Sequence, residues 1–346
     1  MGASAPLGAG VTPRRIAAPL ALALLAALGS VSAADAQPGS HLLVIVGLGG
    51  DMENASRFHQ WASAIVDAAR ERFGLSADSV VYLGEDPARD PKRISGPSTR
   101  EAIAAAADRL ARAARPGDTV FVVLIGHGAS ATGGSRFNLR GPDLTAAEYA
   151  PLLTRFAAQT LVFVNTASAS GGFVQALSGR NRVVIAATAS DGERNQTRFG
   201  EFFAEGFTAD GADGDKDGRV SVLEAFNWAR TRVADSYKRD GQLLTEHAVL
   251  DDNGDGKGAV APGQPGEDGA LARTLFMSAS SATRTIPDQA DPELRALVAR
   301  RDALEARIAA LRAAKDKTDP KTYEADLEGL LIDLARVNRS IREKQK

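Results

Sequence analysis

Two polar residues, His127 and Ser168, each follow an apolar run that is typical of a buried strand. The first run covers residues 120–125 and the second covers residues 161–164, and both consist of aliphatic, largely β-branched side chains and phenylalanine. In an open α/β sheet the carboxyl ends of neighbouring strands meet at one edge, where ligands and reactive groups collect. We therefore expect His127 and Ser168 to lie at the same edge of a sheet.

A histidine beside a serine is a pairing that nucleophilic catalysis uses. A serine hydroxyl is a weak nucleophile and needs a neighbouring base to remove its proton. Neutral imidazole can do this near its ordinary pKa, and it can then protonate the leaving group. Gly128 follows His127, and its backbone N–H, with that of Ser168, is suited to stabilising an oxyanion. The alternative is structural, with a buried histidine at a strand end and a serine in a tight turn.

Residues 213–224 match the twelve-residue calcium loop of an EF-hand at every ligand position. Acidic residues occupy positions one, three and five, glycine provides the sharp turn at position six, and glutamate closes the loop. The predicted ligands are Asp213, Asp215, Asp217, the carbonyl of Arg219, Ser221 and Glu224. Hard carboxylate oxygens at this spacing favour Ca²⁺ over zinc. We expect a structural calcium clamp rather than a sensor, the alternative being an acidic surface turn before a helix.

A second acidic stretch, residues 251–256, begins the same pattern with the letters D-D-N-G-D-G, but Pro262 stands at the twelfth position. Two interpretations stay open for it, an incomplete second calcium site or an Asp/Gly turn. The histidines show no paired spacing of the kind that zinc sites use, so the sequence gives no support for zinc.

The elements that position these residues alternate between strand and helix. Strands are predicted at residues 41–47, 79–83, 120–125, 161–164 and 182–188, and helices at residues 56–73, 98–114, 145–156 and 171–178. This alternation predicts an α/β fold with a mostly parallel sheet covered by helices on both faces. The glycine-rich stretch 130–141, between the two key strands, is predicted as a loop.

Two amphipathic helices are predicted at the end of the chain, at about residues 292–315 and 322–344. Each carries a leucine-rich apolar stripe, and Asp319-Pro320 separates them. The pattern predicts an antiparallel, coiled-coil-like helical hairpin. Self-association, partner binding and docking on the preceding domain all remain open for it, as does a simple solvated surface.

The first 36 residues have the order of a secretory signal peptide. Arg14 and Arg15 precede an apolar stretch at residues 16–28, and an A-D-A cleavage site follows at residues 34–36. The apolar stretch is short for a bilayer span, so we predict an exported protein, periplasmic or secreted, with no stable membrane span after cleavage. An uncleaved N-terminal anchor is the alternative.

The composition restricts the classes of function. The chain has 346 residues, a formal net charge of −2 and 24% charged residues, which does not favour nucleic-acid binding. It has no cysteine, which excludes disulfides, thiolate metal sites and a cysteine nucleophile. The predicted organisation is a signal peptide at 1–36, an α/β domain at 40–280 that contains the calcium loop, and the hairpin at 290–346.

The two strand-end motifs resemble those of the caspase–legumain group of cysteine peptidases. In that group one hydrophobic run ends in His-Gly, and a second ends in Asp/Glu-Ala-Cys-x-Ser-Gly. Here V-L-I-G-H-G-A matches the first motif, and N-T-A-S-A-S-G-G-F matches the second at Ala167, Ser170 and Gly171. Ser168 then stands at the position of the catalytic cysteine, and Thr166 at that of the acid. The stretch V-G-L-G-G-D-M-E-N-A-S-R-F-H-Q-W also resembles the legumain branch.

The resemblance covers about residues 40–237 and implies a caspase-like three-layer sandwich acting on peptides or proteins. Two functions follow from it. One is a hydrolase that cleaves peptide bonds through an acyl-enzyme on Ser168, with His127 as the base. The other is an inactive pseudopeptidase, a calcium-stabilised binding or scaffold protein that keeps the pocket. A serine nucleophile usually requires a third group that orients the histidine, and Asn54 and Asn165 are the candidates for that role.

Overall fold

The computed structural model describes residues 38–132, 134–216, 219–263, 267–279, 292–314 and 318–344. The chain divides into two units, residues 1–35 and residues 36–346. The predicted signal peptide therefore lies outside the described residues. Among the helices of the described ranges, none has both the length and the apolar content that crossing a membrane requires.

A seven-stranded sheet forms the centre of the fold, in the order β10-β9-β8-β4-β1-β2-β3. Its strands are β1 (Ser40–Val46), β2 (Val80–Gly84), β3 (Gly96–Pro97), β4 (Thr119–Ile125), β8 (Thr160–Asn165), β9 (Arg182–Ala186) and β10 (Val249–Asp251). Neighbouring strands are parallel, except that β10 runs antiparallel to β9. The central strands β1 and β4 are buried along their whole length. A strand with two buried faces has a continuous apolar run, as the sequence shows.

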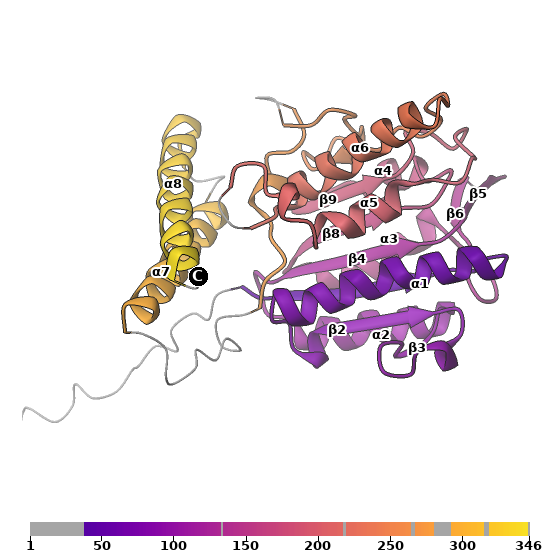
Figure 1. Ribbon diagram of the computed structural model, residues 1–346, viewed down its shortest axis with the longest axis horizontal. Helices are drawn as coiled ribbons and strands as arrows, with labels where there is room; N and C mark the ends of the chain where they lie inside the picture. The colour runs from indigo at the N-terminus through magenta and orange to yellow at the C-terminus, as the bar shows by residue number, and fades with distance from the viewer. Residues whose placement is uncertain are drawn as a thin grey trace, which may run out of the picture. The chain divides into compact units, whose positions relative to one another are not determined.

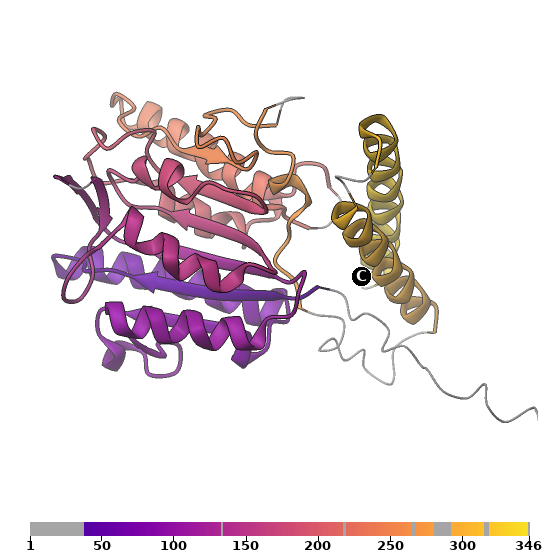
Figure 2. The same ribbon diagram turned by 180° about the vertical axis from the view of Figure 1, so that it is seen from behind.

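Helices cover both faces of this sheet (Figure 1, Figure 2). One face carries α1 (Met52–Asp67), α5 (Phe199–Gly206) and α6 (Val222–Arg239), and the other carries α2 (Arg100–Ala113), α3 (Ala146–Leu153) and α4 (Gly172–Leu177). Alternate residues of β1 divide between two hydrophobic cores, with Leu42 and Val44 on the α1 side and Leu43 and Ile45 on the α2 side. The predicted α/β three-layer sandwich with a mostly parallel sheet is confirmed.

The predicted loop at residues 130–141 is wrong, because much of this stretch belongs to a small antiparallel sheet. Its strands are β5 (Gly128–Ala131), β6 (Gly134–Phe137) and β7 (Leu144–Thr145). Ser135 and Phe137 of β6 are buried, whereas Gly134 and Arg136 are not, and this alternation is typical of a strand. The glycines and serines around these two residues hid that alternation. The sheet lies beyond the carboxyl ends of the central strands (Figure 1).

The C-terminal helices form the predicted antiparallel hairpin, from α7 (Pro292–Ala313) and α8 (Pro320–Lys344). Its buried seam consists of Leu304, Ile308, Leu330, Leu334, Val337 and Ile341. Lys344 Nζ lies 2.5 Å from Glu293 Oε2, so the end of the second helix contacts the start of the first. Spacing of the leucines at one face of each helix is sufficient to predict this arrangement.

A buried polar cluster joins the starts of β1 and β4. The Asp118 carboxylate accepts hydrogen bonds from the Gly39 N–H (2.7 Å), the Arg115 N–H (2.8 Å) and His41 Nε2 (3.1 Å). Burial alone raises the pKa of Asp118, but the hydrogen bonds from His41, Arg115 and Gly39 outweigh it and lower the pKa overall. Asp118 thus stabilises the fold in its ionised form.

Replacing Asp118 with alanine leaves these donors without an acceptor in a buried place, so we expect a loss of about 2 to 4 kcal/mol of unfolding free energy near neutral pH. The pKa of Asp118 is lower in the folded protein than in the unfolded chain. The stabilisation from its ionised carboxylate is therefore complete above the unfolded-state pKa of about 3.9 and is lost as the pH falls through the folded-state pKa. Urea unfolding at about pH 7 and about pH 3 should show the gap between wild type and Asp118→Ala narrowing in acid.

The matched control is Asp78→Ala, which removes an exposed carboxylate paired with Arg109. We expect that variant to lose less than about 1 kcal/mol. Equal losses in the two variants, or a gap for Asp118→Ala that does not change with pH, would contradict this account of the cluster.

Candidate active site and calcium loop

The structure brings Gly128 and Ser168 into contact at the carboxyl edge of the sheet. β4 and β8 are parallel neighbours, so the segments that follow them, with His127 and Ser168, start from the same edge. The Ser168 hydroxyl donates a hydrogen bond to the Gly128 carbonyl oxygen over 3.1 Å. The two motifs therefore lie close together in space because β4 and β8 are neighbours in the sheet.

Gly128 has no room for a side chain. A Cβ at this position would lie 2.3 Å from the carbonyl oxygen of Ser168. In the β5–β6 ladder Gly128 is opposite Phe137, while Asn138 donates to the carbonyl of His127 over 3.0 Å. Bonded and non-bonded pairs alternate in antiparallel ladders, so the N–H and C=O of Gly128 point away from β6, to the side where Ser168 bonds.

The His127 ring is oriented by a backbone carbonyl. Its Nε2 lies 3.1 Å from the Gly49 oxygen, and because a carbonyl only accepts, Nε2 must carry a proton. In the neutral ring Nδ1 then keeps the lone pair. Phe58 of α1 packs edge-on to the imidazole, with ring centroids 5.0 Å apart. Sequence analysis missed Gly49 because a carbonyl acceptor can come from any residue type.

Neither asparagine that was predicted to orient His127 does so. The Asn54 amide donates to Asp51 over 2.9 Å and accepts from Gln196 over 2.6 Å. Asn165 is fully buried and accepts from the N–H of Ala167 over 3.0 Å. Neither asparagine is therefore the third member, since Asn54 bonds to Asp51 and Gln196, Asn165 bonds to Ala167, and the imidazole is held by Gly49.

The Ser168 hydroxyl bonds to a carbonyl and not to the imidazole. No hydrogen bond between Ser168 and His127 occurs in the part of the chain that the structure describes. Ser168 is only 5% exposed. Thr166, at the position where the resemblance has an acid, donates its hydroxyl to the Leu124 carbonyl over 2.9 Å. In this arrangement the serine is held in place but is not activated by a base.

The turn after Ser168 is fixed by a set of hydrogen bonds. Ala169 has a φ of 51°, in the left-handed region that costs energy for a residue with a Cβ. Its N–H donates to the Glu193 carbonyl (2.8 Å), its carbonyl accepts from Ser135 Oγ (2.6 Å), and the Ser170 N–H donates to Thr188 Oγ1 (2.8 Å). Within the described residues the Ser168 N–H has no hydrogen-bond partner.

A second polar pair, which sequence analysis missed, lies near the carboxyl ends of β1 and β2. His59 Nδ1 is 2.9 Å from the Tyr82 hydroxyl, and both residues line a cavity of about 430 Å³. Burial lowers the pKa of His59 and raises the pKa of Tyr82, so both groups are neutral near physiological pH. The only signal in the sequence is a tyrosine in an otherwise aliphatic strand.

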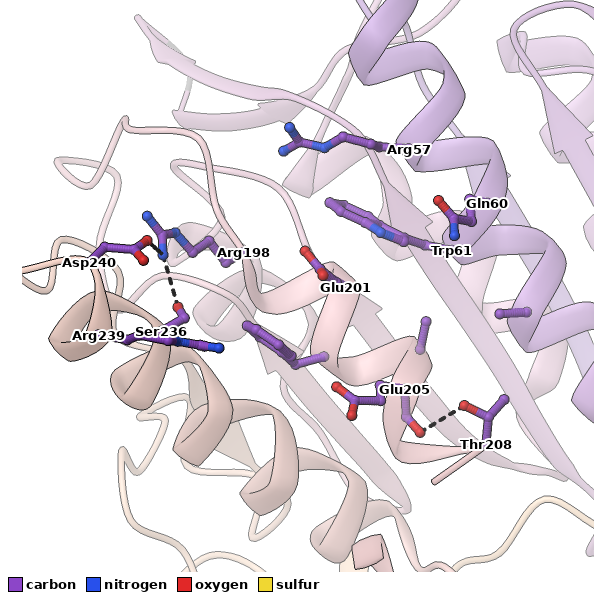
Figure 3. A pocket seen from close by; sticks show the side chains of 13 residues that line it. Arg57, Gln60, Trp61, Arg198, Glu201, Glu205, Thr208, Ser236, Arg239 and Asp240 are labelled. Carbon is purple, nitrogen blue, oxygen red and sulfur yellow. Dashed lines mark hydrogen bonds and ion pairs between the residues drawn. The ribbon is translucent and has the colours of Figure 1, made fainter. Parts of the chain in front are cut away.

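A groove of about 710 Å³ lies between α1, α5 and α6 (Figure 3). Its charged side chains include arginines and carboxylates in equal number: Arg57, Arg198, Arg239, Glu201, Glu205 and Asp240. Arg198 donates to Asp240 over 2.6 Å and its guanidinium lies 4.3 Å from the centre of the Tyr237 ring. The groove does not contain His127 or Ser168, and its balanced charges favour neither an anion nor a cation.

The predicted calcium loop, residues 213–224, lies toward the amino edge of the sheet, opposite to the candidate active site. Ser221, at the end of the loop, forms an isolated bridge with Phe276. The carbonyl of Phe276 accepts from Ser40, the first residue of β1, over 3.3 Å. A cation bound in this loop therefore has no direct part in chemistry at His127.

Within the described residues, Asp213, Asp215 and Glu224 are the acidic cluster whose carboxylate oxygens lie within 4.8 Å of one another. Glu224 Oε1 accepts from the N–H groups of Gly214 (3.0 Å) and Asp215 (3.3 Å). Its Oε2 accepts from the N–H (2.8 Å) and the hydroxyl (2.7 Å) of Ser221, the N-cap of α6. Converging carboxylates in a closed loop fit Ca²⁺.

Of two other predicted ligands of this loop, Asp217 and Arg219, the structure describes only Arg219. Asp217 lies outside the described residues. The Arg219 guanidinium lies 3.9 Å from the centre of the Phe276 ring, so the side chain packs on that ring. The predicted calcium ligand of this residue is its backbone carbonyl, which this packing leaves unchanged.

Comparison with known proteins gives similarity to solved structures alone. No family model matches the sequence, and no curated protein matches it. Among solved structures the chain is similar to the crystal structure of the Drosophila initiator caspase Dronc, at 12% identity and a TM-score of 0.38, over 64% of this chain and 81% of that chain. The fold is assigned from the strand order and from the helices on both faces of the sheet, which are consistent with a caspase-like sandwich.

The geometry predicts the tautomer of His127. In the neutral ring we expect the His127 proton on Nε2, because the Gly49 carbonyl can only accept a hydrogen bond. His247 is the internal contrast, since its Nδ1 lies 3.1 Å from the Glu193 carboxylate and should carry the proton. Long-range ¹⁵N–¹H NMR spectra separate the two tautomers, and an Nδ1-protonated His127 would contradict the site.

Proposed function

We propose that this protein is an exported pseudopeptidase of the caspase–legumain type, which binds an extended peptide at the carboxyl edge of its sheet without cleaving it. The observation that carries the proposal is the Ser168 hydroxyl, which donates to the Gly128 carbonyl and is nearly buried, instead of donating to His127. The resemblance of the two strand-end motifs supports the peptidase ancestry.

The chemistry of the two nucleophiles explains why the site binds rather than cleaves. A cysteine thiol has a pKa of about 8.5, so a neighbouring histidine can ionise it without a third residue. A serine hydroxyl needs a histidine whose cationic form is stabilised by an acid. Here the orienting group is the neutral Gly49 carbonyl, which fixes the ring but adds no negative charge. Ser168 thus lacks the support that its own chemistry needs.

Backbone donors support the binding of a peptide carbonyl. The N–H of Ser168 has no partner within the described residues, and the N–H of Gly128 points to the same side as the carbonyl that Ser168 contacts. In peptidases two such N–H groups bind the carbonyl oxygen of the substrate. A peptide carbonyl that accepts from these donors would use the site without any bond being broken.

We further propose that the loop at residues 213–224 binds Ca²⁺ and stabilises the fold. The converging carboxylates of Asp213, Asp215 and Glu224 support this, because a bound cation would offset their mutual repulsion. The loop connects α5 with α6, so a bound ion would hold the start of α6 against the domain. In a periplasmic or extracellular medium even a weak site of about 10⁻⁴ M is occupied when calcium is millimolar.

Peptide hydrolysis is the second candidate function, and one observation favours it. With Nε2 bound to Gly49, the lone pair of the neutral His127 ring is on Nδ1, the nitrogen that is not used by the backbone. Rotation of the Ser168 side chain away from Gly128 would then free its proton for a base. The pseudopeptidase and the hydrolase therefore differ in whether rotation of the Ser168 side chain leads to cleavage of a bound peptide.

Cleavage of a mixed peptide library by the mature protein, with calcium present, distinguishes the two functions. We expect wild type and Ser168→Ala to give the same background, because the hydroxyl is not activated. Ser168→Cys should cleave at least about tenfold above that background, since His127 can ionise a thiol at this position. His127→Ala in the cysteine variant is the control and should abolish the gained activity.

Cleavage by wild type that is lost in Ser168→Ala would establish the serine hydrolase and overturn the pseudopeptidase. Absence of cleavage by all variants, with each shown to be folded, would mean that His127 and position 168 do not form a peptidase site at all.

Removal of calcium tests the proposed clamp. Free calcium at about 100 times its Kd should add about 2.7 kcal/mol to the unfolding free energy, and a chelator should remove this gain. We expect Glu224→Gln to show a clearly smaller calcium-dependent rise of Tm in thermal unfolding, because it loses the closing carboxylate. Glu201→Gln, an exposed position on α5, should keep the full rise. An unchanged rise in Glu224→Gln would contradict calcium binding at this loop.

A further inference from the structure

The loop that follows β10 repeats the start of a calcium loop. Asp251, Asn253 and Asp255 stand at positions one, three and five, and Gly256 stands at position six. Gly256 has a φ of 76°, which suits the sharp turn at this position. From the sequence alone the loop is incomplete, because Pro262 at the twelfth position has no ligand to offer.

Asp268 occupies the place of the missing twelfth residue. In the first loop Glu224 Oε1 accepts from the N–H groups of the second and third loop residues, at 3.0 Å and 3.3 Å. In this loop Asp268 Oδ1 accepts from the corresponding N–H groups, those of Asp252 (3.0 Å) and Asn253 (3.2 Å). The closing carboxylate is therefore supplied by a segment that returns to the loop from farther along the chain.

The segment that carries Asp268 is bound to the loop by Asp252. The two oxygens of Asp252 accept from the N–H groups of Gly269 and Ala272, each over 2.8 Å. Asp252 and Asp268 thus exchange hydrogen bonds between the same two segments. This contact fixes the closing carboxylate without any help from the regular loop spacing.

An independent observation points to a bound cation. Asp251 is only 1% exposed, and its Oδ2 has no hydrogen-bond partner among the described residues. Asp268 is 4% exposed. Buried carboxylates with an unsatisfied oxygen are unfavourable unless a cation compensates them.

We propose that this loop binds a second Ca²⁺. The ligands are Asp251, Asn253, Asp255, the carbonyl of Lys257 and Asp268. The middle residues of the loop are exposed, so the ion can enter from solvent to the buried pair of carboxylates. A set of carboxylate, amide and carbonyl oxygens favours Ca²⁺ over the smaller Mg²⁺, which requires a more regular octahedral geometry.

The two loops differ in one respect that binding would change. The three carboxylates here do not bring their oxygens within 4.8 Å of one another, as those of the first loop do. Asp255 Oδ1 bonds instead to the N–H of Lys257 over 2.8 Å. Binding of the ion draws Asp255 inward toward Asp251 and Asp268. Calcium binding at this loop is independent of ion binding at residues 213–224 and of whether the protein cleaves peptides.

Counting bound calcium on the mature protein tests the site. Isothermal titration calorimetry with Ca²⁺ should give two ions per chain for wild type and one for Asp268→Asn, which keeps an oxygen acceptor but loses the charge. Glu267→Gln removes an exposed charge from the adjacent residue and should still bind two. If Asp268→Asn does not fold, Asp255→Asn at the exposed rim tests the same site and should weaken one binding event at least tenfold.

Glu224→Gln distinguishes the first loop from this one. This variant should also bind one ion, and the double variant with Asp268→Asn should bind none. One ion in wild type that is lost in Glu224→Gln and kept in Asp268→Asn would overturn the second site and leave the first. One ion that is lost only in Asp268→Asn would uphold the second site and refute the first. Equal stoichiometry in Asp268→Asn and Glu267→Gln would also overturn the proposal.

Discussion

The close approach of Gly128 to Ser168 is the constraint on which the candidate site depends. A side chain at position 128 would collide with the Ser168 carbonyl, and the absence of one lets the serine hydroxyl reach the Gly128 carbonyl. Parallel pairing of β4 and β8 fixes the two segments at this distance. The same contact that packs the strand ends together also takes the hydroxyl proton that catalysis would need. Packing and nucleophile activation therefore compete for one hydrogen bond.

The acidic loop at residues 213–224 and the candidate site lie at opposite edges of the sheet. His127 and Ser168 follow the carboxyl ends of their strands, where backbone N–H groups remain open. The calcium loop before α6 contacts Phe276 and through it the start of β1, at the opposite edge. The cation proposed for this loop would therefore stabilise the domain without contacting the groups around Ser168.

Much of the fold could be predicted from residue types, but the decisive contacts of the site could not. Short, continuous apolar runs rich in β-branched residues, such as residues 120–125, are typical of central parallel strands, because both faces of such a strand are buried. The β5–β6 hairpin was missed since its alternation rests on Ser135 and Phe137 among glycines. Gly49 and Asp268 were missed for a different reason. One acts through its backbone and the other reaches its partners from a distant segment, and neither leaves a mark in local spacing.

Reaction with a fluorophosphonate is the most direct test of the central claim, that the Ser168 hydroxyl is held by a carbonyl and is not activated by His127. Such probes phosphonylate serines that a base has activated, and mass spectrometry locates the adduct. The account predicts no adduct on Ser168 in the calcium-loaded mature protein under conditions that label a serine peptidase completely. An adduct on Ser168 that disappears in His127→Ala would contradict it and identify a working serine hydrolase.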